Sequence, residues 1–240
     1  MKIHRFLISN DLAPGIDLMV QDPGVVHQMK TVLRLRQGAV VSFFNNRGQE
    51  VRARLVRIDG GRALCRIEEA MQKTADAPSA VTVYCAILKR ENFEWVAQKT
   101  TEIGVRALVP CITDRTVKQR IAPERINAII RQAAQQSGRA TVPALGDIVP
   151  FSGALEAAIA QHASCVFFDP RGSKINVGLG ATKRAGAVAV FIGPEGGWSE
   201  EEYAVARAKG CLILSLGETV LRGETAAVIG AYLAVQGLIA

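Results

Sequence analysis

The 240-residue sequence lacks several features that define other classes of protein. Aromatic residues make up only 5% of it. No apolar run approaches the roughly 20 residues that a membrane-spanning helix needs. The start of the chain, Met1–Arg5, is not followed by the apolar core of a signal peptide. We therefore expect neither a membrane protein nor a secreted one.

Cysteine and histidine are scarce and scattered. The cysteines are odd in number and mostly lie inside apolar runs: Cys65, Cys85, Cys111, Cys165 and Cys211. No CxxC or HxxxH spacing occurs, so we expect no metal site, and we expect His4, His27 and His162 to be structural. This cysteine usage predicts reduced, buried thiols and a cytoplasmic location.

The common nucleotide-binding motifs are also missing. No GxGxxG follows a predicted strand, and no GxxxxGK precedes a serine or threonine. Gly178-Leu179-Gly180 follows no clear strand and lacks a third glycine. By motif, the sequence is neither a Rossmann dehydrogenase nor a P-loop NTPase.

What the sequence does contain begins with β-type alternation over residues 1–72. The pattern predicts strands at 40–44, 50–58 and 63–67, joined by turns at Asn45–Gly48 and Asp59–Gly61, and a helix over 23–33. These elements predict a small β-barrel domain. The polar, proline-containing stretch at 73–80 predicts a linker.

From residue 81 the pattern changes to alternating strands and helices, typical of an α/β domain with a mostly parallel sheet covered on both faces. We expect this domain to span 81–240. The predicted strands are 81–88, 106–110, 164–168, 187–192 and 211–215. The predicted helices are 91–104, 123–137, 152–161, 199–209 and 224–238. Ser199 and Glu202 have the spacing of a capping box, and Gly210 is placed to end that helix.

The positive charge is concentrated in one segment. Of the net charge of +7, all lies between Lys30 and Arg66, where nine basic residues face two acidic ones. Eight of the nine are arginine, which binds phosphate in a bidentate manner. Such clustering indicates a polyanionic partner, nucleic acid above all. A solvated β face is the alternative.

Two glycine-containing loops near the end of the chain each join a predicted strand to a helix. The first is Ile192-Gly193-Pro194-Glu195-Gly196-Gly197, and the second runs from Leu216-Gly217 to Thr225-Ala226. Glycine lets bare backbone approach a ligand. Loops at neighbouring strand ends predict a ligand crevice, although turn glycines are the alternative. Asp169–Gly172, after the strand at 164–168, could add a third loop.

These loops resemble the signatures of the SPOUT methyltransferase superfamily, and within it the RsmE family of 16S ribosomal RNA uridine-N3 methyltransferases. The resemblance extends to nearly the whole chain, in order and at family spacing. It includes Arg5-Phe6, His27, Val32-Leu33-Arg34, Gly38, Lys89, Glu94, Gln98–Val105, Pro110, Glu124-Arg125, Gln135–Arg139 and Pro143. Two positions depart from the family pattern: Thr219, usually basic, and Gly223, often bulkier.

The resemblance implies a PUA-like β-barrel followed by an α/β domain tied in a trefoil knot, and a homodimer. It implies S-adenosylmethionine as cofactor and 16S rRNA of the small ribosomal subunit as partner, with no metal. The implied cofactor-binding residues are Phe168, Ile192, Gly193, Pro194, Gly197, Leu216, Gly217, Val220, Leu221, Thr225 and Ala226. The expected RNA-binding residues are Arg5, Lys30, Arg34, Arg36, Arg52, Arg54, Lys89, Arg90, Arg115 and Arg139.

Arg222 and Glu224 are the expected catalytic residues. Methyl transfer to uridine N3 removes a proton and leaves negative charge on the ring carbonyl oxygens, which a positioned cation stabilises. Arg222 would supply the cation and Glu224 would accept the proton or hold the base or Arg222 in place. The alternative is a pair of charges at a helix end. Trp198 could stack on a base or belong to the core.

Two other functions fit the same sequence features. One is a SPOUT methyltransferase acting on transfer RNA or on a different rRNA base. The other is an RNA-binding protein without catalysis that assists ribosome assembly through its basic barrel. Affinity for S-adenosylmethionine separates the latter from the two enzymes.

Overall fold

The computed structural model describes residues 3–71, 80–117, 120–175 and 186–239, except for the side chain of Arg90. The chain forms two compact units. The first contains Met1–Ala77 and Ala134–Val142, and the second contains Pro78–Ala133 and Pro143–Ala240. The assignment of 134–142 to the first unit adds a segment that the expected linear division into 1–72 and 81–240 does not contain.

The first unit is built on a five-stranded sheet with the order β1-β3-β4-β5-β2. Its strands are β1 (His4–Leu7), β2 (Asp17–Val20), β3 (Val40–Phe44), β4 (Glu50–Asp59) and β5 (Arg62–Ala70). The three predicted strands correspond to β3, β4 and β5, whereas β1 and β2 were not predicted. Asn46 and Gly48 have positive φ angles of 57° and 82°, which the β3–β4 hairpin turn requires.

The helix predicted at 23–33 consists of two parts. It begins as α1 (Pro23–His27), capped by the Asp22 side chain, and continues as a π-helical turn, Gln28–Val32. Met29 is fully buried, and Leu33 and Leu35 pack on the core of the sheet. These three apolar side chains therefore hold the segment against the core of the sheet.

The second unit contains a seven-stranded sheet with the order β12-β10-β11-β6-β7-β8, and β9 also pairs with β7. The strand pairs of this sheet are parallel throughout the described residues, as expected. The strands are β6 (Val81–Ala86), β7 (Ala107–Ile112), β8 (Ala144–Leu145), β9 (Val149–Pro150), β10 (Ser164–Lys174), β11 (Val188–Ile192) and β12 (Leu212–Ser215).

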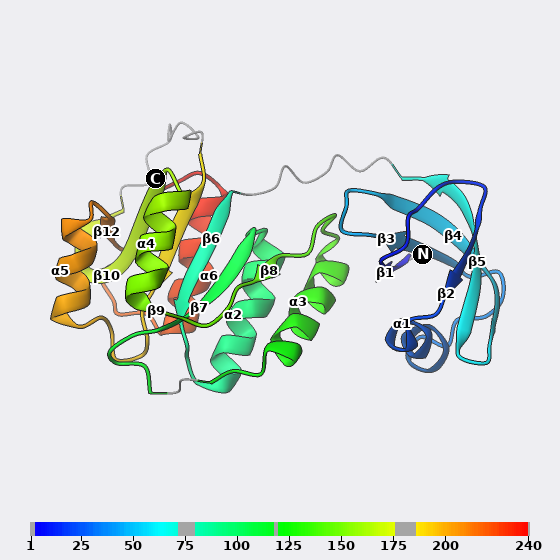
Figure 1. Ribbon diagram of the computed structural model, residues 1–240, viewed down its shortest axis with the longest axis horizontal. Coiled ribbons are helices and arrows are strands. Elements are labelled where there is room, and N and C mark those ends of the chain that lie inside the picture. Colours follow the sequence, from blue (N-terminus) through cyan, green and yellow to red (C-terminus); the bar gives the residue numbers. More distant parts are fainter. Residues whose placement is uncertain (1–2, 72–79, 118–119, 176–185, 240) are drawn as a thin grey trace. The chain divides into compact units, whose positions relative to one another are not determined.

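Helices cover both faces of this sheet (Figure 1). They are α2 (Arg90–Ile103), α3 (Pro123–Ser137), α4 (Phe151–Gln161), α5 (Glu200–Ala208) and α6 (Gly223–Val235). An aromatic core that includes Tyr84, Phe167 and Phe191 lies under α4 and α5. On the other face α6 packs on β6, β11 and α2. All five predicted helices are present, and none in the described part of the chain is long and apolar enough to cross a membrane.

The start of α5 is formed as the sequence predicts. The Ser199 hydroxyl accepts the Glu202 amide hydrogen, and the Glu202 carboxylate accepts the Ser199 amide hydrogen. Glu202 also accepts from the backbone of Asp114 at 3.0 Å, so the cap ties the β11–α5 loop to the segment after β7. This attachment fixes the first glycine-containing loop at the carboxyl end of the sheet.

Candidate active site

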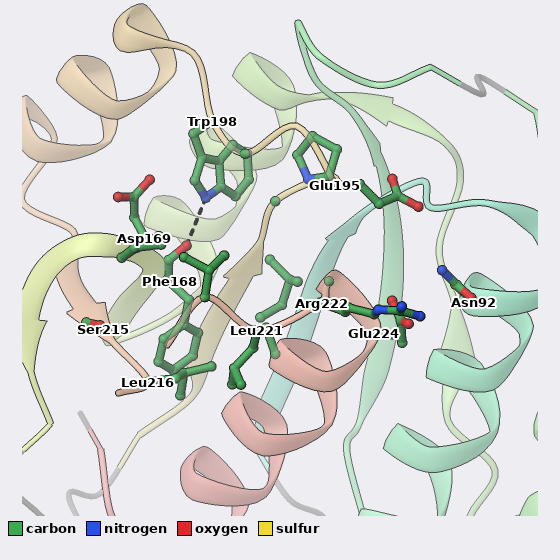
Figure 2. Close-up of a pocket in the computed structure, with 18 of the residues that line it drawn as sticks. Asn92, Phe168, Asp169, Glu195, Trp198, Ser215, Leu216, Leu221, Arg222 and Glu224 are labelled. Carbon is green, nitrogen blue, oxygen red and sulfur yellow. Dashed lines mark hydrogen bonds between the residues drawn. The ribbon is translucent and has the colours of Figure 1, made fainter. Parts of the chain in front are cut away.

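A pocket of about 540 Å³ lies at the irregularity of β10 after Phe168, where β11 and β12 end and α6 begins. Because parallel strands end at the same edge of a sheet, the loops that follow them meet there. Three loops and the start of α2 form its walls (Figure 2). They contribute Lys89, Asn92, Phe168, Asp169, Pro170, Ile192, Gly193, Pro194, Glu195, Gly197, Trp198, Ser215, Leu216, Thr219, Val220, Leu221, Arg222, Gly223, Glu224 and Ala226.

One wall is fixed by Trp198. Its indole Nε1 donates a hydrogen bond to the carbonyl oxygen of Phe168 at 2.9 Å (Figure 2). The side chain is 3% exposed and packs against Phe151 and Phe167. A Cβ at Gly193 would lie 3.0 Å from the indole, so the glycine there allows the loop to close over the ring. Of the two expectations for Trp198, the core position is the one observed.

The opposite side of Phe168 rests on α6. A Cβ at Gly230 would lie 2.5 Å from the Phe168 ring, closer than real Cβ atoms come to another heavy atom. The helix can therefore approach the pocket wall only with glycine at this position. Gly223 is similar, because its Cβ would lie 3.0 Å from Leu88 and 3.4 Å from the Gly193 carbonyl oxygen. This packing gives a structural reason for the small residue at 223.

Arg222 and Glu224 lie at the start of α6, as N-cap and in the first turn. Both side chains project from the helix toward the side of the pocket where Asn92 of α2 lies (Figure 2). Arg222 is exposed and forms no ion pair with any described residue. The Oε2 atom of Glu224 is buried and has no hydrogen-bond partner in the described structure. Buried polar atoms are nearly always paired, so this oxygen indicates a place for a ligand donor.

Asp169 is a buried carboxylate in the pocket wall. Arg171 donates to it from Nε at 2.8 Å and from Nη2 at 3.0 Å, and also contacts Glu200 and the ring of Tyr203. Burial acts to raise the pKa of Asp169, but the hydrogen bonds and charge of Arg171 outweigh it and hold the pKa below its ordinary value. The wall therefore contains an ionised carboxylate at neutral pH.

Two further contacts join the loops around the pocket. The Glu195 carboxylate accepts a hydrogen bond from the backbone of Lys89 at 3.1 Å. Arg115 donates to the Gly196 carbonyl oxygen at 3.0 Å. The first glycine-containing loop is thus held to the β6–α2 loop and to the segment after β7.

Most of the expected cofactor-binding residues come together in this pocket. Those that line it are Phe168, Ile192, Gly193, Pro194, Gly197, Leu216, Val220, Leu221 and Ala226, whereas Gly217 and Thr225 do not. Gly217 has φ of +151°, which suits glycine, and a Cβ there would meet nothing within 4 Å. Its place in the second loop is therefore a matter of backbone conformation rather than of contact with the pocket.

Eight lining residues were not among those expected to bind the cofactor or RNA or to act in catalysis: Asn92, Asp169, Pro170, Glu195, Trp198, Ser215, Thr219 and Gly223. Of these, Asp169 and Pro170 belong to the possible third loop, and Trp198 was considered as a residue that stacks on a base. Their signal was the strand ends themselves, since Asp169, Pro170 and Ser215 lie at or directly after predicted strands. Asn92 belongs to a helix start outside the glycine-containing loops. No pattern in the sequence marked it.

The expected RNA-binding residues are dispersed. Lys89 lines the pocket, and Arg115 is bound to the adjacent loop. Arg52 and Arg54 form ion pairs with Glu69 and Glu68. Lys30, Arg34 and Arg36 are exposed. Arg90 is the first residue of α2, and its side chain lies outside the described structure.

Arg5 and Arg139 require a correction, because both are largely buried. Arg5 donates to both oxygens of Glu50 at 2.8 Å and its guanidinium lies 4.5 Å from the centre of the Phe44 ring. It also donates to carbonyl oxygens of the 134–142 segment, including that of Arg139 at 3.0 Å. Arg139 itself is 6% exposed. We assign both to structure, in holding 134–142 to the first unit.

Taken together, the fold and the pocket define an α/β protein with a small-molecule site at the carboxyl end of a parallel sheet. Comparison with known protein families identifies the class of protein more narrowly. The RNA methyltransferase domain family matches residues 75–234, and the RNA methyltransferase PUA domain family matches residues 24–68. The chain belongs to this RNA methyltransferase family, and the resemblance to the RsmE family and the PUA-like fold are confirmed.

Individual relatives cover almost the whole chain. Ribosomal RNA small subunit methyltransferase E of Rickettsia conorii is 26% identical over 231 residues, which is 95% of this chain and 93% of the relative. A methyltransferase from Legionella pneumophila, solved with bound S-adenosylmethionine, is 30% identical with a TM-score of 0.87 over 98% of this chain and 97% of its own. The small subunit methyltransferase E of Neisseria gonorrhoeae, also bound to S-adenosylmethionine, is 28% identical with a TM-score of 0.86 over 99% and 98%.

Proposed function

We propose that this protein is an S-adenosylmethionine-dependent methyltransferase that methylates N3 of a uridine in 16S rRNA of the small ribosomal subunit, in the cytoplasm. The observation that supports it most is the pocket, in which Arg222 and Glu224 lie beside the glycine-containing loops, the buried Oε2 atom of Glu224 having no hydrogen-bond partner among the described residues. Relatives of the same fold have been solved with S-adenosylmethionine.

The residues of the pocket fit this cofactor. A volume of about 540 Å³ lies in the range of small-molecule sites, about 300–1,000 Å³. The carboxylates of Asp169 and Glu195 match a ligand with positively charged sulfonium and ammonium groups. Gly193 and Gly197 present bare backbone, and apolar side chains such as Leu216 and Leu221 complete the walls. We propose that these groups, with Phe168, Ile192, Pro194, Val220 and Ala226, hold the cofactor.

Gly217 and Thr225 act on the same site indirectly in this proposal. Neither lines the pocket, but both belong to the segment that supplies Leu216, Leu221 and Ala226. The φ of +151° at Gly217 sets the course of the loop after Leu216. A side chain there would strain the loop rather than enter the cofactor space.

When bound, S-adenosylmethionine supplies an electrophilic methyl group. The chain has to bring the uridine ring into line, remove the N3 proton and stabilise the charge that follows. Arg222 would donate hydrogen bonds to a ring carbonyl oxygen as that charge develops, and Glu224 Oε2 would accept the proton. Lys89 lies in the same pocket and suits a phosphate of the target strand. The step requires no metal.

Nucleoside mass spectrometry of 16S rRNA tests this function. RNA from a strain without the gene should lack one N3-methyluridine, and purified protein with S-adenosylmethionine should restore it. Restoration on isolated small subunits, compared with naked rRNA, identifies the form of substrate. Loss of a methyl group from transfer RNA instead, with 16S rRNA unchanged, would overturn the proposal.

The Phe168 wall provides a direct test of cofactor binding. Gly230→Ala places a Cβ against the Phe168 ring and should push it toward the pocket. Overpacking costs about 1–3 kcal/mol. If movement into the pocket relieves this strain, S-adenosylmethionine affinity falls by about 5- to 150-fold. Isothermal titration calorimetry measures the change.

A matched control and a rescue variant make that test specific. Gly153→Ala changes a helical glycine whose Cβ would meet only ordinary contacts, at 3.8 Å from Pro150, so affinity should be unchanged. Adding Phe168→Leu to Gly230→Ala should recover part of the loss, because the smaller side chain leaves room for the Cβ. An unchanged affinity in Gly230→Ala would show that the pocket wall does not depend on this contact.

We also propose a homodimer that uses α6. The helix is buried along Ala227, Gly230, Ala231 and Ala234, yet Ile229 and Tyr232 are 37% and 51% exposed. A helix that is apolar on every side is normally covered on more than one side. A second copy of the chain, as in the SPOUT superfamily, would cover this face.

Charge on that face should therefore separate the subunits. Ile229→Asp with Tyr232→Asp is expected to give a monomer in light scattering at micromolar concentration, because carboxylates would be desolvated in the interface. Ile159→Asp on α4 is the control, since Ile159 is similarly exposed at 39% but lies on another helix. A native protein that is monomeric at these concentrations contradicts the proposed dimer.

A further inference from the structure

Ion pairs divide the basic residues of the first unit into two groups. On β4 and β5, Arg52 pairs with Glu69 at 2.7 Å, Arg57 with Asp59 at 2.8 Å and Arg66 with Asp17 at 2.8 Å. Arg47 and Arg54 are also paired, with Asp11 and Glu68. Each of these cations has a carboxylate beside it that repels phosphate. The β4–β5 surface is therefore close to neutral locally, although its arginines are numerous.

Lys30, Arg34 and Arg36 form the second group, here called the basic corner. All three are exposed, and none forms an ion pair with a residue in the described part of the chain. Residues 23–49 contain no aspartate or glutamate at all. Arg62 also forms no ion pair with a described residue, but it faces Asp59 across the β4–β5 turn. Within the described residues of the first unit, the basic corner is thus the place where several positive charges remain uncompensated within a few residues.

The backbone holds the basic corner in a defined shape. Lys30 lies in the π-helical turn, and the amides of Leu33 and Leu35 donate to the carbonyl oxygens of Gln28 and Met29 at 2.9 Å. Leu33 and Leu35 pack inward, while Arg34 and Arg36 between and after them are exposed. π-Helical turns within helices occur frequently at functional sites.

Arg34 is in a left-handed conformation that side chains rarely adopt, with φ of +50°. Asn46 is the other described non-glycine residue with positive φ, and it lies in a hairpin turn where this is usual. Backbone strain of this kind persists where the surrounding structure imposes it, and it clusters at functional sites. Here the left-handed residue lies between two partly buried leucines, Leu33 and Leu35, with its own side chain exposed.

We propose that the basic corner, rather than the arginines of β4 and β5, is the surface of the first unit that binds the phosphates of the RNA substrate. Guanidinium groups match phosphate oxygens in a bidentate manner. An unpaired cation meets phosphate without first giving up a carboxylate partner. This inference rests on the proposed function for the identity of the RNA, and it assigns the contact to Lys30, Arg34 and Arg36.

Two variants of equal charge test it. Lys30→Gln/Arg34→Gln/Arg36→Gln and Arg52→Gln/Arg57→Gln/Arg66→Gln each remove three positive charges. Binding of a short single-stranded, uridine-containing RNA to the full-length protein is measured by fluorescence anisotropy over a range of salt. Each lost phosphate contact makes the slope of log binding constant against log salt concentration less negative by roughly 0.7. The slope of the corner variant should therefore be shallower by about 2. At about 0.1 M salt this corresponds to roughly 100-fold weaker binding.

The control variant should lose far less, because its arginines are neutralised in place. Equal losses in the two variants, or a larger loss in the β4–β5 variant, would overturn the proposal. Both proteins should keep native S-adenosylmethionine affinity, since the pocket lies in the second unit. If the native protein binds RNA as described but neither binds S-adenosylmethionine nor methylates RNA, the proposed function fails while the inference stands.

Arg34→Gly separates charge from folding. Glycine accepts positive φ without strain, so this variant should unfold at a higher temperature than the native protein while binding RNA roughly 5-fold more weakly. Arg34→Lys keeps the charge and should recover part of the affinity. Native RNA affinity in Arg34→Gly would show that the left-handed arginine has no part in binding.

Discussion

Replacing Arg222 with alanine is expected to lower turnover by about 10²–10³-fold, the usual effect of removing one preorganised donor to a developing oxyanion. Arg222 is exposed at the pocket and unpaired with any described residue, so its charge is available to a substrate. The dissociation constant of S-adenosylmethionine should change little, because the groups proposed to hold it lie in the loops and in the walls around Leu216 and Leu221. Single-turnover methylation of small subunits, with calorimetry for the cofactor, measures both quantities.

Arg222→Lys distinguishes charge from geometry. Lysine keeps the positive charge but lacks the planar, bidentate donor set, so partial activity is expected. A structural role as N-cap of α6 predicts something different, namely a loss of stability with no specific loss of turnover. The side chain makes no capping hydrogen bond, so the helix itself should tolerate the change. Near-normal methylation by Arg222→Ala would show that Arg222 is only a charge at the end of a helix.

Much of the α/β unit follows from the sequence because each of its elements is long and locally patterned. Strand β6 is a continuous buried apolar run, and α5 has its capping box in the sequence. Strands β1 and β2 are different, since each has four residues, and the partners that β1 finds in β3, such as His4 and Val41, are 37 positions apart in the sequence. Strand β10 extends to Lys174 beyond its predicted end, past an irregularity after Phe168. Pairing partners, not local pattern, create these strands.

The site was predictable to the extent that it is made of loops with glycines. Asn92 enters the pocket from a helix start, and its place there depends on how α2 packs beside α6. The glycines at 193, 223 and 230 are visible in the sequence. What requires glycine there is the close approach of Trp198, Leu88 and Phe168, which the sequence does not show. Such contacts between distant residues are properties of packing. The trefoil knot implied by the family stays a prediction.

The ion pairs show most clearly what the sequence alone does not reveal. The sequence locates the basic residues but not their partners, so Arg52 was grouped with Arg34 as an RNA contact. Arg52 meets Glu69 across two strands, at a separation of 17 residues. Arg5 meets Glu50 at a separation of 45 residues and becomes part of the interior. Which cations remain free for a polyanion is decided by the register of the sheet.

Glu224→Gln is expected to lower turnover by about 10²–10⁴-fold, the range for loss of a general base. Glutamine has nearly the same shape as glutamate but cannot accept the uridine N3 proton. The Oε2 atom of Glu224 is buried, faces a pocket and has no hydrogen-bond partner among the described residues. Leaving a buried charged atom unpaired destabilises a protein, so its retention indicates a function at this position.

The pH profile tells a base from a merely positioned carboxylate. Without the base, methylation depends on uridine that has already lost its proton in solution, so the rate of Glu224→Gln should continue to rise with pH where the native rate has levelled off. If Glu224 only orients Arg222 or the base, the variant should instead show a lower rate with an unchanged profile. The unfolding temperature of Glu224→Gln should not be lower than that of the native protein, because the substitution removes an unpaired buried charge. A variant that is as stable as the native protein, slow at neutral pH and partly recovered at alkaline pH therefore identifies Glu224 as the proton acceptor, whereas near-native turnover at neutral pH excludes it.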